Sequence, residues 1–201
     1  PMPIVVTTAL SSFADADTAL SVIASGGFQF GKTPVADPAT DPSIVGSTVT
    51  AQVTPTVLTL TKTYVGPEGE TATGPNFARQ YVITADIAPG QPVTNLDLSD
   101  TLPSSLQYRS LNASSPVSTA QATPSTTTPG GVLTRRFASV TGGAGSADAS
   151  FTFSYHVPLV ASNSVDVLDP DTGAMVTATD TATASGTWVP LDSRDAARTV
   201  T

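Results

Sequence analysis

Cysteine is absent from this chain of 201 residues, and histidine and tryptophan each occur once. Without cysteine there are no disulfide bonds and no thiolate metal sites, so any covalent cross-link must use other side chains. The lone histidine, His156, alternates with Phe151, Phe153, Tyr155 and Val157, so we expect it to face solvent. Zinc catalysis and a serine triad are both disfavoured, and we expect a protein that is not an enzyme.

Charge and long apolar runs are also scarce. Charged residues make up 12% of the chain, and 16 acidic against 8 basic side chains give a net charge of -8, which argues against nucleic acid as a partner. No apolar run approaches the roughly 20 residues of a membrane span, so we expect no membrane insertion. Abundant Thr, Ser, Gly and Pro are typical of secreted bacterial repeat proteins and predict an extracellular or cell-surface location.

Alternating apolar and polar residues between turn sequences predict short antiparallel strands. Seven candidates follow residue 55, at 57–64, 78–87, 92–100, 106–111, 132–140, 149–160 and 174–188. The Ser, Thr and Pro residues of 113–131 predict a long exposed loop. The predicted fold class is therefore all-β, a seven-stranded immunoglobulin-like antiparallel sandwich with additional N-terminal strands.

Residues before position 55 form a separate group of short apolar segments. These strand-like pieces lie at 4–10, 19–24, 28–30 and 44–53. We interpret 1–54 as a partial β module or as strands added from a preceding repeat. Residues 55–190 form the predicted sandwich, and the polar residues 191–201 form a tail or linker.

One of the two lysines in the chain falls on an apolar strand face. Side chains alternate between the faces of a strand, so Lys62 points the same way as Leu58, Leu60 and Tyr64. Lysine is almost never fully buried without a partner. An inward lysine therefore predicts an acidic partner inside the sandwich.

The same count along two later strands supplies two acidic groups. Asp100 shares a face with Leu96 and Leu98, and Asp180 shares a face with Ala182 and Ala184. Burial lowers the pKa of an amine and raises that of a carboxyl unless the ions pair. A neutral amine beside a protonated carboxyl is a nucleophile beside an electrophile.

Two outcomes fit this constellation. In the first, Lys62 attacks the carboxyl of Asp180 while Asp100 shuttles protons as the catalytic group, and an intramolecular isopeptide bond replaces one water molecule. In the second, the three groups form an uncrosslinked, structural ion pair with a second hydrogen-bonded acid. Either way, an isolated buried charge is costly, so we expect the three side chains to lie close together.

Three segments also resemble a known family. Residues 58–63 (LTLTKT), 95–103 (NLDLSDTLP) and 180–183 (DTAT) are similar to the DUF11-type repeat domain of bacterial surface proteins, which is related to isopeptide-forming adhesin and pilin modules. The resemblance covers about residues 53 to 189. It implies an immunoglobulin-like fold and a stalk or adhesin role. Family members usually carry asparagine where this chain has Asp180, and related modules accept aspartate there.

Acidic turns supply a second, weaker hypothesis. Oxygen ligands for Ca²⁺ could come from six aspartates: Asp15, Asp17, Asp37, Asp41, Asp169 and Asp171. Aspartate also forms turns without any metal. The hypothesis of a Lys–Asp cluster requires no cofactor, and Ca²⁺ is the cofactor that these turns could hold.

We therefore expect an extracellular structural module of an adhesin, surface fibre or surface-layer protein. Its partners would be neighbouring repeats or subunits of the same protein, assembled head to tail, and a host or cell-surface ligand. The alternative is a Ca²⁺-assisted, ligand-binding or glycan-binding tip domain.

Overall fold

The computed structural model describes residues 5, 10–25, 27–29, 43–45, 48–67, 77–167 and 179–201. Within these ranges every regular element is a strand, and all strand pairs are antiparallel, which confirms the all-β prediction. The predicted strand at 4–10 lies largely outside the described residues, and the one predicted at 174–188 is described only from residue 179. The chain divides into two compact units, Pro1–Leu10 with Ala14–Thr56, and Ser11–Phe13 with Val57–Thr201.

The first unit contains two small antiparallel pairs. Strand β1 (Leu20–Ala24) pairs with β4 (Val49–Val53), and β2 (Gly27–Gln29) pairs with β3 (Ser43–Val45). In the first pair, Leu20 lies opposite Val53, Val22 opposite Ala51, and Ala24 opposite Val49. Because directly opposed residues share a face, one side of this ribbon is apolar throughout.

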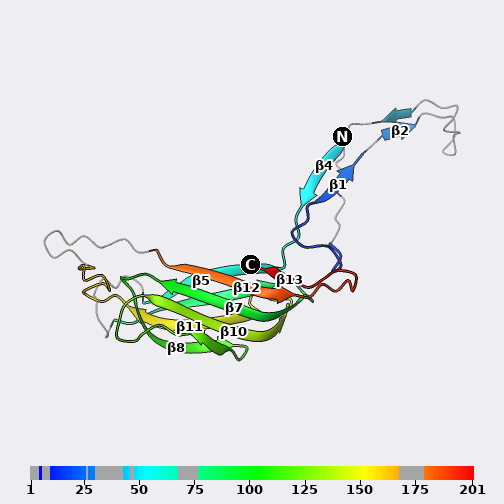
Figure 1. Ribbon diagram of the computed structural model, residues 1–201. Coiled ribbons are helices and arrows are strands. Elements are labelled where there is room, and N and C mark those ends of the chain that lie inside the picture. The colour runs from blue at the N-terminus through cyan, green and yellow to red at the C-terminus, as the bar shows by residue number, and fades with distance from the viewer. Residues whose placement is uncertain are drawn as a thin grey trace. The chain divides into compact units, whose positions relative to one another are not determined.

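The second unit is a β-sandwich (Figure 1). One sheet has the order β5-β6-β11-β8, and the other has the order β13-β12-β7-β10-β9. The strands span Leu58–Gly66 (β5), Arg79–Ile87 (β6), Pro92–Leu102 (β7), Gln107–Ser115 (β8), Thr119–Ala122 (β9), Gly131–Thr141 (β10), Ala149–His156 (β11), Thr181–Trp188 (β12) and Arg198–Val200 (β13).

Strand number and order differ from the expected immunoglobulin pattern. The described part of this unit has nine strands, not seven. The sheet that begins with β5 and β6 continues with β11 and then β8. Strands β5 to β8 and β10 to β12 can be named A to G in chain order. This sheet then has the order A-B-F-D, whereas the corresponding immunoglobulin sheet has the order A-B-E-D. The sandwich is supported, and the immunoglobulin topology is not.

The polar segment 113–131 is not one long loop, so that prediction is wrong. Strand β8 continues to Ser115, and β9 pairs with β10 at the edge of its sheet. The tail 191–201 likewise contributes β13, which pairs with β12. Both strands are edge strands, hydrogen-bonded to one neighbour each, and β13 also buries Val200.

The core is formed by the inward side chains of both sheets. Its fully buried large residues include Trp188, Phe137, Phe151, Phe153, Ile83 and Leu96. A register shift between β7 and β12 lies beside Asn95, whose φ of 50° is in the left-handed region that asparagine tolerates. This bulge lets both Val93 and Leu96 face the core.

Candidate functional site

Strand β5 carries the lysine on its inner face. Its residues alternate between half-buried and exposed from Leu58 to Gly66, with the threonines outward. Lys62 lies on the inner side, opposite Ile83 of β6, and its side chain is only 15% exposed. The alternation of Leu and Thr thus fixes the direction of the amine.

Strand β7 supplies the first carboxyl. It is an interior strand, paired with β12 on one side and with β10 on the other. Asp100 faces inward with Leu98 and Leu102 and has no exposed side-chain surface. An acid at this position cannot be solvated by bulk water, so its charge depends on neighbouring groups.

The second carboxyl comes from the residue that precedes β12. Ala182 lies directly opposite Asp100, and Ala184 opposite Leu98, so the even-numbered residues of this segment face the core. Asp180 follows that parity, and its side chain is 8% exposed. The small alanines beside it leave space for side chains from the opposite sheet.

These three side chains converge on one point. Lys62 Nζ lies 2.6 Å from Asp100 Oδ2 and 2.5 Å from Asp180 Oδ2. In the part of the chain that the structure describes, the buried Oδ1 atoms of Asp100 and Asp180 accept no hydrogen bond. A single amine therefore faces two carboxyls, and one positive charge can balance only one of them.

Burial raises the pKa of the Asp100 carboxyl to about 7. The neighbouring Asp180 carboxyl raises this pKa further, while the Lys62 amine lowers it. Desolvation is the largest cause because the charged carboxylate loses its hydration inside the sandwich. At neutral pH a substantial fraction of Asp100 is therefore protonated and can donate a hydrogen bond.

An amine and an acid at this separation can react. Nζ contacts an oxygen of the Asp180 carboxyl, which brings it close to the carbon that it would attack, and a protonated carboxyl beside them can move the protons. The same distances also suit an uncrosslinked ion pair. The geometry accommodates both outcomes expected from the sequence.

A cluster of tyrosine rings lies beside the amine, and the sequence pattern does not predict it. The Tyr81 ring of β6 lies with its centroid 4.4 Å from Lys62 Nζ. Tyr81 stacks on Tyr155 with centroids 5.0 Å apart and meets the edge of Tyr64 at 5.7 Å. The alternation along β5 predicts that Tyr64 shares a face with Lys62. The position of Tyr81 depends on the pairing of β5 with β6, which neither segment predicts by itself.

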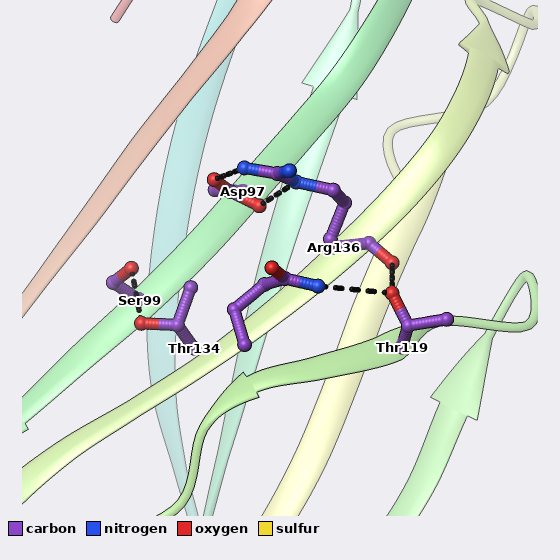
Figure 2. A network of polar contacts seen from close by, with 6 residues as sticks. Asp97, Ser99, Thr119, Thr134 and Arg136 are labelled. Carbon is purple, nitrogen blue, oxygen red and sulfur yellow. Dashed lines mark hydrogen bonds and ion pairs between the residues drawn. The ribbon is translucent and has the colours of Figure 1, made fainter.

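The outer face of the same sheet as Asp100 holds a separate ion pair. Arg136 of β10 donates from Nε to Asp97 Oδ1 at 2.8 Å and from Nη2 to Oδ2 at 2.6 Å (Figure 2). Ser99 and Thr134 are hydrogen-bonded beside it on the same two strands. Asp97 thus points away from the core, as its parity predicts, and takes no part in the lysine cluster.

Only two of the six candidate calcium ligands, Asp15 and Asp17, lie among the described residues. Asp15 accepts a hydrogen bond from Thr18 Oγ1 at 2.8 Å, an ordinary polar turn, and Asp17 has a φ of 61°. Asp37, Asp41, Asp169 and Asp171 lie outside the described residues. Among the residues that are described, no group of three or more acidic or histidine side chains could hold a metal ion.

His156 and Trp188 are both buried. His156 is only 6% exposed, so the expectation that it faces solvent is wrong. Its strand is paired on both sides, and its neighbour Ser154 on that face is covered as well, by Asn112 of β8. Trp188 is buried as a core residue, and its Nε1 donates to Gln91 Oε1 at 3.0 Å.

In the described ranges the structure contains no helix long and apolar enough to span a membrane. Comparison with models of protein families and with curated proteins gave no match for this chain. The similarity of its motifs to DUF11-type repeats therefore stays a hypothesis.

Proposed function

We propose that this protein is an extracellular structural module of a bacterial surface protein, locked by an autocatalytic isopeptide bond between Lys62 and Asp180. The observation that supports it best is the position of the Lys62 amine, within 2.6 Å of one carboxyl and 2.5 Å of another inside an apolar core. Lys62 lies on a strand of one sheet, and Asp180 directly precedes a strand of the other. The bond would therefore join the two layers of the sandwich.

The reaction uses only groups of this chain. In the reactive state the amine is neutral and both carboxyls are protonated. This state has the same net charge and the same number of protons as the state with an ammonium, one carboxylate and one protonated carboxyl. Lys62 Nζ attacks the carboxyl carbon of Asp180, and Asp100 donates a hydrogen bond to the developing oxyanion. The N–C bond forms, the C–OH bond breaks, and Asp100 transfers the amine proton to the departing hydroxyl, which leaves as water.

The proposed role is mechanical and involves no turnover of an outside substrate. A chain of such modules would be loaded through its ends, with neighbouring repeats or subunits as partners. A covalent link between β5 and the start of β12 would carry this load past the strands in between. Low charge and a hydroxyl-rich surface suit an extracellular fibre, and the net charge of -8 disfavours nucleic acid.

Pulling a single molecule by its two ends tests the mechanical role. Lys62 and Asp180 are 118 residues apart (180 minus 62), and an extended chain spans roughly 3.3–3.6 Å per residue, so the bond would withhold about 400 Å of extension. We expect the wild-type chain to unfold to a contour length shorter by that amount than the Lys62→Arg variant. Equal contour lengths would exclude a load-bearing bond.

The rate of bond formation should depend on the Asp100 proton. Because the pKa of Asp100 is raised to about 7, its proton is retained below that pH and lost above it. We expect a nearly constant rate from pH 5 to pH 7 and a fall of about tenfold per pH unit beyond it. Intact mass measured at intervals after synthesis gives the rate.

The Asp100→Asn variant provides the control for this pH dependence. Its amide can donate a hydrogen bond but cannot relay a proton, so we expect a slow rate without a break near pH 7. A wild-type rate that instead climbs from pH 7 to pH 9 would mean that Asp100 is not the proton carrier.

A further inference from the structure

Tyr81 presents the face of its ring to the Lys62 amine. The residue lies on β6, directly opposite Tyr64 of β5 and Phe153 of β11. Its ring centroid is 4.4 Å from Nζ, within the distance of a cation–π contact. Strand β6 supplies neither carboxyl of the cluster, so this contact is an independent constraint on the amine.

The orientation of this ring is itself fixed by other rings. Tyr155 stacks on Tyr81 with an interplanar angle of 7°, and Tyr64 meets it at 67° with centroids 5.7 Å apart. Stacked and edge-to-face pairs of this kind are favourable arrangements of aromatic side chains. The ring face is therefore held toward the amine.

A lysine amine has to be held in place before it can react. Its four-carbon chain has many rotamers, and ordering it is costly. The two carboxyls attract the ammonium electrostatically, but they do not determine from which side it approaches. The negative face of an aromatic ring attracts the ammonium as well, and this attraction is strongest where water is excluded.

We propose that Tyr81 is a positioning residue for the cross-linking reaction, whose ring face holds the protonated Lys62 amine beside Asp100 and Asp180 until its proton passes to a carboxylate. This inference rests on the proposed isopeptide bond and adds to it a residue that takes no part in the proton transfers. This role requires the electron density of the Tyr81 ring and does not require its hydroxyl group.

Fluorination of this ring tests the inference with little change of shape. The full chain is made by cell-free synthesis with phenylalanine, or with mono-, di- or trifluorophenylalanine, at position 81. The linked fraction is read at successive times from the loss of one water molecule in the intact mass. We expect Tyr81→Phe to link within about twofold of the wild-type rate, and the rate to fall with each added fluorine, by about tenfold for the trifluorinated ring.

The same fluorinated series at Phe137 is the matched control. Phe137 is a buried ring on β10 of the other sheet, and we expect its fluorination to leave the rate unchanged. Tyr81→Leu, which keeps an apolar side chain without a ring, should be at least as slow as the trifluorinated variant.

The possible failures can be told apart. A wild-type chain that never loses water overturns the isopeptide bond, and the role of Tyr81 with it. A wild-type chain that links at a rate unaffected by fluorination overturns only the role of Tyr81. A Tyr81→Phe variant that does not link also overturns that role, because the effect would then lie in the hydroxyl group.

Discussion

The Lys62→Arg variant is expected to lose about 4–5 kcal/mol of unfolding free energy, the value expected when a cross-link that closes a loop of this size is removed. Arginine retains the positive charge, but its guanidinium stays protonated and cannot act as the nucleophile. The loss should appear as a lower midpoint in guanidinium chloride unfolding. The intact mass of the variant should equal its sequence mass.

The chain contains its own control for this substitution. Lys32 is the other lysine, 30 positions before Lys62 in the sequence, and Lys32→Arg makes the same chemical change there. We expect this variant to keep both the wild-type midpoint and the wild-type mass. If the two substitutions shift the midpoint equally, Lys62 has no special role in stability.

Trp188→Ala is expected to lower the free energy of unfolding by about 3–5 kcal/mol, because it empties the largest fully buried side-chain volume in the core. It also removes the donor that Gln91 Oε1 accepts at 3.0 Å, which leaves a buried amide oxygen without its partner. Denaturant unfolding followed by circular dichroism measures the change.

A smaller aromatic side chain at this position gives an intermediate case. Trp188→Phe retains a six-membered aromatic ring but loses the five-membered ring that carries the N–H, so its stability should fall between those of wild type and Trp188→Ala. Neither variant touches the lysine cluster, so both should still link. A Trp188→Ala variant as stable as wild type would mean that the tryptophan does not anchor this end of the sandwich.

Local alternation was enough to predict the strand class and the direction of the key side chains. In β5 and β12, small or apolar residues alternate with threonine, and the inner face is half-buried in β5 and half-buried to buried in β12. That regularity placed Lys62, Asp100 and Asp180 on inner faces before any pairing was known. The alternation predicts side-chain direction in these strands because a shift of one residue would expose the entire apolar face.

Features that depend on neighbouring strands could not be predicted in this way. His156 is buried although its parity assigns it to the outer face of β11, and β9 and β13 form because a partner edge is available to them. Tyr81 reaches the amine only through the pairing of β5 with β6. None of these features produces a pattern within its own segment, because each depends on contacts with other strands.

The intact mass of the folded, purified protein, measured under denaturing conditions, tests the central claim most directly. The account predicts a mass lower than the sequence mass by one water molecule, together with a branched peptide after digestion that joins the segments containing Lys62 and Asp180. A mass equal to that of the sequence, with Lys62 recovered in a linear peptide and free to react with an amine reagent, would contradict it.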